Sequence, residues 1–452
     1  MSLRVASLLA TVLACSACAL VDPNNVIARH FGEATPMPTE VVPSPTPATL
    51  GTAKRERAFD FVWTTIEQRY RDASFNGIDW NAVGKRYRPR ALAAADDDAF
   101  WDVLDRMTGE LHDSHTRVES PKRVALREKN EAITLGFSFL PIDGRLAVSA
   151  VHPDSDAYWA GVRPGMAIVS IGGKPAPQAY RELLAGTRND STDRARRLRV
   201  VRQLVTGAEG TSEAFTFERA DGSRFDARLT RRRIEGHPRE EHRVLPSGFG
   251  YLRFSQWTIG LTLRAMAGLD ALKDAPGLVI DLRNNPGGSV HAVNALLDRF
   301  FAHRTELGGT TTRSGRPISL FLGSVEIIKL KRTAAGNANA YRGPVVILTN
   351  AVSASGSELF AGTMQAAGRA RVVGQPSCGC LMGFLGYARI PGGGELAYSE
   401  VGFTLTNGKH IEGEGVLPDD PVAITFADLQ ASRDRTLEEA QAVLKTMQPW
   451  PQ

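Results

Sequence analysis

The spacing of apolar residues predicts a helical region near the N-terminus. Between residues 53 and 112, apolar side chains recur every three or four positions in two sets, which are Phe59, Val62, Trp63, Ile66 and Tyr70, and then Phe100, Val103, Leu104, Met107 and Leu111. This spacing places each set on one face of an α-helix. Asn76-Gly77 and Pro89 interrupt the pattern between the two sets. We therefore expect two or three helices, and we assign them to a helical domain over residues 53–127.

A change to short segments predicts a β-rich domain over residues 128–234. Each segment contains β-branched or aromatic residues and is bounded by turn residues, which is typical of strands; the expected strands cover 133–139, 146–151, 166–171, 215–218 and 225–229. Asp221-Gly222 separates the last two and favours a hairpin turn. Residues 191–205 have helical spacing and polar character, so we expect a helical insert there.

Beyond residue 235, apolar runs alternate with helical stretches. The runs cover 250–254, 277–282, 345–348 and 371–373, and the helical stretches cover 261–272, 292–301 and 358–367. Strands without polar alternation are buried on both faces, as in a parallel sheet covered by its crossover helices. We expect a third domain over 235–433, with antiparallel strands around 395–405, and a C-terminal helix and tail over 434–452. The predicted fold class is a multi-domain α/β protein.

The first residues indicate export. Arg4 precedes an apolar stretch over residues 5–14, which is shorter than the roughly 20 residues that span a bilayer but fits a secretory signal peptide. The stretch ends before Cys15 and Cys18, and it resembles a bacterial lipoprotein signal in which one such cysteine becomes lipid-modified. We assign residues 1–14 to the signal peptide and 15–52 to a proline-rich linker. An ordinary signal peptide with incidental cysteines is the alternative, and both interpretations place the protein in the periplasm or cell envelope.

Composition and charge exclude several classes of protein. Among 452 residues, 54 Lys and Arg oppose 49 Asp and Glu, and 42% of residues are hydrophobic, which are globular proportions. The arginines between 194 and 202 form one short run that is more simply a solvated helix face than a nucleic-acid-binding stripe. We expect no nucleic-acid partner. We also expect no metal or cofactor, because no cluster of His, Asp and Glu has the spacing of metal ligands.

Two segments carry residues suited to catalysis. Ser355 lies where an apolar strand runs into a helix, so its hydroxyl is expected at the positive end of the helix dipole, with the N–H of Gly356 beside it. Ser355 to Glu358 also read as a capping box, which needs no catalysis. The second segment is the turn Pro286-Gly287-Gly288, where the glycines allow close approach of the backbone to a ligand. A plain tight turn is the alternative there.

The order of five segments resembles the C-terminal processing peptidases, the tail-specific serine proteases that carry a PDZ domain. The segments are Leu135-Gly136-Phe137, the run from Ala160 to Met166, the IDLRNNPGG turn, SASGSE, and the run from Glu412 to Asp419. The likeness covers about residues 55 to 430. It implies an N-terminal helical domain, a PDZ-like β domain and a ClpP/crotonase-like α/β protease core, with polypeptides as substrates.

The resemblance implies that Ser355 is the nucleophile, but this chain lacks the lysine that serves as base in many members. That lysine follows the serine by 25 residues, and position 380 is a cysteine here. After Ser355 the only lysines are Lys409 and Lys445. A Ser-Lys pair at the usual place is excluded, so another base must activate the hydroxyl.

A second branch of the family, similar to the tricorn protease core and to interphotoreceptor retinoid-binding protein, points to a histidine. Its Asp-Ser-His-Thr-like run matches Ser114-His115, which implies His115 as base with Ser114 assisting. The tricorn glutamate matches Glu412, with Glu414 as the alternative. Histidine suits this role because its ordinary pKa of about 6.5 lies near working pH. The oxyanion would be bound by the N–H groups of Gly356 and of Gly287 or Gly288, all three being oxyanion-hole candidates.

The PDZ resemblance implies a peptide-binding strand over Leu135, Gly136, Phe137 and Ser138 that holds a terminal carboxylate. The insert between 176 and 210 departs from a minimal PDZ domain. Cys378 and Cys380 are interpreted as packing residues, with a redox-sensitive pair or a thiol nucleophile as alternatives.

The sequence is compatible with two functions. The first is a secreted serine endopeptidase that cleaves unfolded or C-terminally exposed polypeptides through an acyl-enzyme. The alternative is a catalytically inactive protein that binds peptides or apolar ligands on the same fold, as the retinoid-binding relatives imply.

Overall fold

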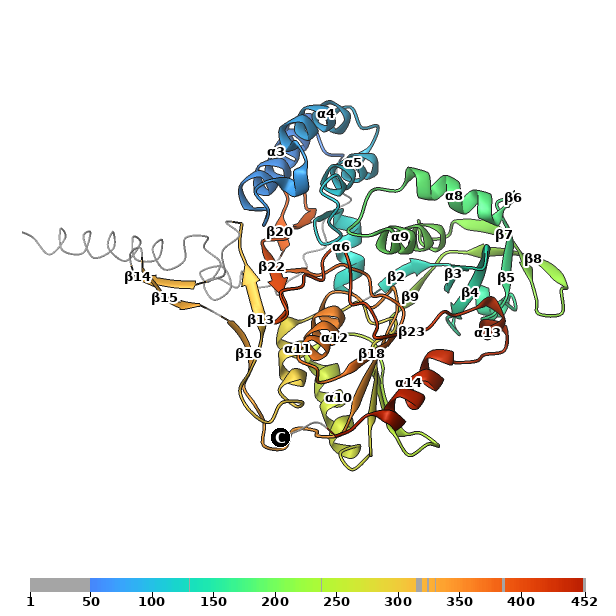
Figure 1. The fold of residues 1–452 in the computed structure, drawn as a ribbon. Coiled ribbons are helices and arrows are strands. Elements are labelled where there is room, and N and C mark those ends of the chain that lie inside the picture. The colour runs from blue at the N-terminus through green and yellow to red at the C-terminus, as the bar shows by residue number, and fades with distance from the viewer. Residues whose placement is uncertain are drawn as a thin grey trace, which may run out of the picture.

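The computed structural model describes residues 49–129, 131–236, 238–313, 319–322, 325–329, 331–383 and 387–449. The expected signal peptide, most of the linker, and both candidate lipidation sites, Cys15 and Cys18, lie outside these residues. Figure 1 shows three regions side by side: a helical region in blue, a β-rich region in green, and an α/β region that contains most of the chain from yellow to red. The predicted mixed α/β fold is confirmed.

The α/β region is built on a six-stranded sheet with the order β10-β11-β12-β17-β18-β23. Its strands are β10 (Glu240–Val244), β11 (Gly250–Phe254), β12 (Leu278–Asp281), β17 (Val345–Thr349), β18 (Arg371–Gly374) and β23 (Asp420–Pro421). All neighbours pair in parallel except β10 with β11. The four apolar runs of the sequence are therefore the four central strands.

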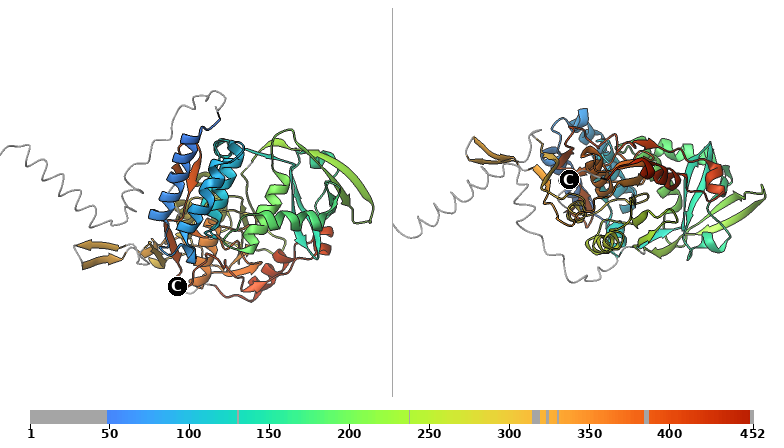
Figure 2. Two further views of the ribbon diagram at one scale, coloured as in Figure 1. Left: turned by 90° about the horizontal axis from the view of Figure 1, so that it is seen from above. Right: turned by 60° about the horizontal axis from the view of Figure 1, so that its bottom comes forward.

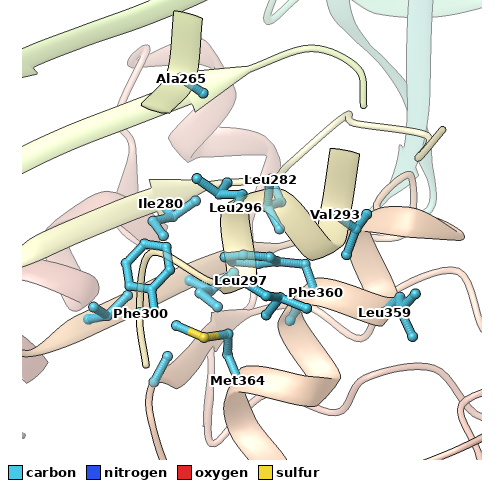
Figure 3. Packing of buried hydrophobic residues seen from close by; sticks show 14 of the residues in the cluster. Ala265, Ile280, Leu282, Val293, Leu296, Leu297, Phe300, Leu359, Phe360 and Met364 are labelled. Carbon is cyan, nitrogen blue, oxygen red and sulfur yellow. The ribbon is translucent and has the colours of Figure 1, made fainter. Parts of the chain in front are cut away.

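Both faces of this sheet are covered, which explains why its strands are apolar without alternation. Leu252, Ile280 and Ile347 point to one face and pack against α10 (Ile259–Ala271), α11 (Val290–Leu297) and α12 (Gly356–Ala366). Figure 3 shows this packing, in which Ile280, Leu296, Phe300, Phe360 and Met364 belong to one buried cluster. The neighbouring residues Tyr251, Val279 and Val346 point to the other face and pack against α14 (Arg435–Thr446). The C-terminal helix thus belongs to the core of this region.

The helical region contains α3 (Thr52–Arg69), α4 (Trp80–Leu92) and α5 (Asp97–Gly109), and then β1 (Arg117–Glu119) and α6 (Pro121–Glu128). Its core includes the two predicted apolar sets, but the region is not complete without the C-terminal half of the chain. Strand β21 (Glu395–Ala397) pairs with β1 on one side and with β20 (Tyr387–Arg389) on the other, and this segment contributes Ile390, Leu396 and Tyr398 to that core. The domain limits of 53–127, which were predicted from local pattern, therefore leave out residues 390–398, which complete the core of the helical region.

The β-rich region contains one sheet with the order β3-β4-β5-β7-β8, with β6 paired to β5. Its strands are β3 (Phe137–Ile142), β4 (Arg145–Val151), β5 (Ala167–Ile171), β6 (Lys174–Pro175), β7 (Ser212–Glu218) and β8 (Arg224–Thr230), and a separate pair joins β2 (Glu131–Thr134) to β9 (Arg232–Glu235). Three helices accompany them, α7 (Asp156–Trp159), α8 (Ala176–Gly186) and α9 (Asp193–Val205). Helix α9 is the predicted insert, whereas α8 was not predicted.

A further sheet has the order β16-β13-β22-β19. It consists of β13 (Thr305–Thr311), β16 (Lys331–Ala334), β19 (Met382–Gly383) and β22 (Val401–Thr404). Between β13 and β16, the hairpin of β14 (Ser319–Leu322) and β15 (Val325–Lys329) extends away from the rest of the molecule in all views (Figures 1 and 2). The short helix α13 (Phe426–Gln430) contacts β4 and so links the C-terminal segment to the β-rich region. Across the part of the chain that the structure describes, no helix has the length and apolar character needed to span a membrane.

Candidate active site

Ser355 lies at the carboxyl edge of the central sheet, where β17 leads into α12. It has φ 52° and ψ −113°, a region that non-glycine residues rarely adopt. Such strain on a strand-to-helix turn is typical of exposed nucleophiles, because the turn projects the side chain out of the sheet. The Ser355 N–H donates to Glu358 Oε2 at 2.9 Å, so the capping box is present as well. The capping and nucleophile interpretations are therefore compatible.

His115 lies next to Ser355 in the fold, although it precedes Ser355 by 240 residues in the chain. The distance from His115 Nε2 to Ser355 Oγ is 3.2 Å, within hydrogen-bond reach. His115 lies in the turn between α5 and β1, and Asp113 shapes that turn: its Oδ1 accepts from the His115 N–H at 2.8 Å and its Oδ2 from the Thr116 hydroxyl at 2.5 Å. The fold thus brings together the serine and the histidine that the sequence singled out.

Burial changes the protonation of His115. The residue is 8% exposed, and burial lowers the pKa of its imidazole to about 4, with Asp113 opposing the shift and Arg117 adding to it. A neutral imidazole can accept a proton from a serine hydroxyl, whereas a protonated one cannot. His115 is therefore ready to act as a base at neutral pH.

This pKa predicts the acid limb of the activity. Because the base is active only when neutral, kcat/KM should fall as pH decreases through about 4, and remain near its maximum at pH 6. A solvent-exposed histidine would instead give half-maximal kcat/KM near pH 6.5. The measurement is a pH profile of kcat/KM on a short peptide, with circular dichroism at each pH. Half-maximal activity near pH 6.5 in folded protein would contradict a buried base.

Two backbone N–H groups next to Ser355 suit an oxyanion. Within the described residues, neither the Gly356 N–H nor the Gly288 N–H donates a hydrogen bond, and a Cβ placed on Gly356 would lie 3.3 Å from Gly288 N. The Gly287 N–H is already used, since it donates to Asn285 Oδ1 at 3.0 Å. Gly288 has φ +146°, and a Cβ there would lie 2.3 Å from Trp257 O, so only glycine fits. Of the two candidate partners for Gly356, the geometry favours Gly288.

Glu358 is a fully buried carboxylate that the sequence analysis treated only as part of a capping box. It accepts from the Ser355 N–H, from the Ser377 hydroxyl at 2.5 Å, and from the Gly379 and Cys380 N–H groups at 2.7 and 3.0 Å. Burial raises its pKa to about 7, although these donors lower it. Cys380 O also accepts from the Ser355 N–H at 3.2 Å. Glu358 and the 377–380 loop together hold the backbone of the serine.

Cys378 and Cys380 form a disulfide, so their interpretation as unpaired packing residues was wrong. The turn at Gly379, with φ +74°, brings their Cα atoms to 5.2 Å, within the range that a disulfide spans. The pair is buried, and Cys380 Sγ lies 3.6 Å from Ser114 Oγ. A sulfur atom in a disulfide is not a thiolate, so the oxidised pair cannot act as a nucleophile.

We predict that the double variant Cys378→Ala, Cys380→Ala keeps cleaving peptides and loses about 1–3 kcal/mol of unfolding free energy. The backbone N–H groups that hold Glu358 remain, while the unfolded chain regains freedom. Urea unfolding of wild type with and without a dithiol reductant measures the loss, and the double variant should not respond to reductant. A folded double variant without any cleavage would assign a chemical role to sulfur.

Ser114 precedes His115 in the chain and binds Ser191, a residue that the sequence analysis did not single out. Ser114 and Ser191 exchange hydrogen bonds, N–H to Oγ in each direction, at 2.9 and 3.0 Å. Both carboxylate oxygens of Glu412 are buried, and neither has a hydrogen-bond partner among the described residues. Burial, Asp113 and Glu358 raise the pKa of Glu412 well above its ordinary value. Glu414, the alternative, is exposed.

A cavity of about 350 Å³ opens beside Glu412. Arg71, His112, His410, Leu381 and Phe403 are among the residues that line it. His112 is exposed and contacts Asn189 rather than Ser355. Among the described residues, no group of three or more His, Cys, Asp or Glu is arranged to hold a metal ion.

The predicted peptide-binding strand is 135–138, at the edge of the β-rich sheet. Phe137 and Ser138 open the edge strand β3. The Leu135 N–H, however, donates to Val205 O at 2.8 Å, and the Gly136 N–H donates to Thr134 Oγ1 at 3.2 Å. These two N–H groups are engaged within the protein in this conformation.

Some residues of the site carried no signal in the sequence. Asn285 binds Phe254 O through Nδ2 and accepts from Gly287, which fixes the glycine turn; only its place in the IDLRNNPGG segment hinted at a role. Ser191 lies in the insert between 176 and 210, far from every motif, and no local pattern would have identified it.

The sequence of this chain is similar to the sequences of known proteases. Residues 248–422 match the model of peptidase family S41, and residues 52–109 match the tricorn protease C1 domain. The chain is 26% identical over 413 residues to putative tricorn protease homolog 2 from Streptomyces coelicolor, covering 86% of this chain and 32% of that one. It is 25% identical over 405 residues to the carboxyl-terminal-processing protease of Synechocystis sp., covering 86% of both chains. The chain thus spans about a third of the first relative and most of the second.

Solved structures share the fold. The photosystem II D1 C-terminal processing protease aligns with a TM-score of 0.55 at 22% identity, covering 88% of this chain and 98% of that one. Mature CPAF aligns with a TM-score of 0.66 at 15% identity, covering 87% and 97%. The chain thus contains a peptidase family S41 domain over residues 248–422, preceded by a tricorn protease C1 domain over residues 52–109, and these matches support a serine-type peptidase.

Proposed function

We propose that this protein is an exported serine endopeptidase that cleaves unfolded or C-terminally exposed polypeptides through an acyl-enzyme. The observation that carries the proposal is the 3.2 Å distance between Ser355 Oγ and His115 Nε2 at the carboxyl edge of the sheet. The peptidase family S41 domain over residues 248–422 supports the reaction class, and the apolar stretch before Cys15 and Cys18 supports export with a lipid anchor at one of them.

In the proposed reaction, Ser355 Oγ attacks the carbonyl carbon of a peptide bond while its proton passes to His115 Nε2. The protonated imidazole then gives the proton to the departing amine, which leaves an ester between Ser355 and the substrate. Water enters, His115 removes its proton, and the ester is hydrolysed. Ser355 would thus act as the nucleophile and His115 as the general base, as in other serine hydrolases.

The negative charge on the tetrahedral oxygen would be stabilised by the N–H groups of Gly356 and Gly288. Neither donates to an acceptor among the described residues, and the two glycines are neighbours, since a Cβ placed on Gly356 would lie 3.3 Å from Gly288 N. The N-terminus of α12 adds the positive end of its dipole. Donors that are already oriented cost no reorganisation when the charge develops.

Ser114 would assist by holding the histidine turn through its two hydrogen bonds with Ser191, and the buried Glu412 would assist by its charge. A substrate chain terminus would add to the edge strand β3 beside Phe137 and Ser138. Because the Leu135 and Gly136 N–H groups are engaged, capture of the terminal carboxylate would require them to exchange partners.

The test is hydrolysis of reduced, unfolded casein by the purified protein, with products identified by mass spectrometry, and labelling by a fluorophosphonate, which reacts with activated serines. We expect discrete cleavage products and a label on Ser355. Intact casein together with an unlabelled Ser355 would favour the alternative, a catalytically inactive protein that binds peptides or apolar ligands.

A further inference from the structure

We propose that residues 188–194, which join α8 to α9, form a positioning segment that aligns His115 with Ser355, and that Ser191 and Arg194 are its decisive side chains. The proposal rests on the serine-peptidase function above. It concerns residues that do not touch the reacting atoms and that belong to the β-rich region, whereas Ser355 and His115 belong to the other two regions (Figure 1).

The segment first binds the turn that carries the histidine. Ser191 and Ser114 exchange two hydrogen bonds of 2.9 and 3.0 Å. Because Ser114 immediately precedes His115, these bonds restrain the backbone from which the imidazole projects. Ser191 lies 77 positions after Ser114 in the chain, so these two bonds connect the segment directly to the histidine turn.

The segment next binds the loop that holds the serine backbone. Thr192 Oγ1 donates to Cys378 O at 2.6 Å, and Arg194 Nε donates to Ser377 O at 2.9 Å. This loop supplies Cys380 O to the Ser355 N–H and two N–H groups to Glu358. Arg194 Nη2 also donates to Glu414 O, and so connects the turn that follows Glu412.

Arg188 anchors the start of the segment. Its side chain is 3% exposed and pairs with Asp105 at 2.7 Å. The same guanidinium donates to Asp113 O at 3.1 Å and to Thr116 O at 3.2 Å, on the two sides of His115. A buried guanidinium with several acceptors fixes geometry, because releasing any of them would leave charge or a carbonyl without a partner.

These contacts share a pattern that general packing would not produce. All are polar, two reach the turn of His115 and two reach the 377–380 loop, and all come from seven consecutive residues. Displacement of catalytic groups by about 1 Å can lower a rate about 100-fold, so the alignment of Ser355 and His115 is sensitive to these contacts. The expected consequence of weakening them is a loss of turnover with little change in substrate binding.

The experiment compares Ser191→Ala and Arg194→Ala with Arg197→Ala, an arginine that is exposed on the same helix. We measure kcat and KM on a peptide, the rate of Ser355 labelling by a fluorophosphonate, and the urea midpoint. We expect kcat and the labelling rate to fall about 10- to 100-fold in the first two variants, KM to stay within about twofold, and Arg197→Ala to match wild type. Ser191→Thr keeps the hydroxyl and should recover most of the rate.

Each outcome bears on the proposal. Wild-type labelling rates in folded Ser191→Ala and Arg194→Ala would overturn the positioning role and leave the peptidase function intact. A rise in KM at unchanged kcat would also overturn it, because the segment would then bind substrate. If Arg194→Ala fails to fold, Ser191→Ala with Ser191→Thr decides. A wild-type protein that neither cleaves nor becomes labelled refutes the peptidase function, and the proposal with it.

Discussion

Replacement of Ser355 by alanine is expected to lower kcat by about 10⁴-fold or more, to the level that remains when the nucleophile of a serine peptidase is removed. The hydroxyl is the group placed 3.2 Å from His115 Nε2, and no acyl-enzyme can form without it. The measurement is casein cleavage read by mass spectrometry, together with kcat on a defined peptide.

The control for Ser355→Ala is Ser223→Ala, which removes an exposed hydroxyl from the turn between β7 and β8. It should cleave at the wild-type rate. The Ser355→Ala protein should keep its fold, since the Glu358 carboxylate binds the backbone N–H of residue 355, a contact that alanine retains. Full activity in Ser355→Ala would move the nucleophile elsewhere and refute the site.

Replacement of His115 by asparagine is expected to lower kcat by about 10³- to 10⁴-fold. The serine keeps its place but loses the imidazole that takes its proton, and position 380, where the family resemblance would place a lysine base, is a disulfide-bonded cysteine. Residual turnover should show no acid limb near pH 4, since the group that titrates there is gone.

The matched control is His112→Asn, three residues earlier in the same turn. His112 is exposed and lies against Asn189, so its replacement should leave kcat unchanged. If His112→Asn lost activity and His115→Asn kept it, the base would be assigned to the wrong histidine. If Cys380→Ala alone abolished cleavage, the catalytic group would lie in the 377–380 loop.

Local patterns predicted the elements whose cause is local. The apolar runs over 250–254, 277–282 and 345–348 became β11, β12 and β17, because a strand buried on both faces cannot alternate polar and apolar residues. The helical spacing of Phe59, Val62 and Ile66 likewise predicted α3. Strands whose partners are distant in the sequence were harder to predict. For example, β1 pairs with β21, and no sequence feature near residue 117 indicates that its partner is residue 397.

The residues of the site likewise fall into those that the sequence predicted and those that only the tertiary structure brought together. By itself the sequence determined the element types and, through short motifs, the candidate nucleophile and base, Ser355 and His115. Only the tertiary structure decided that these two lie 3.2 Å apart, that the Gly287 N–H is already used whereas the Gly288 N–H donates to no described residue, and that Ser191 binds the histidine turn through Ser114. The physical reason is range: propensity and periodicity act over a few neighbouring residues, whereas these contacts join residues 77 and 240 positions apart, which only packing of the whole chain brings together.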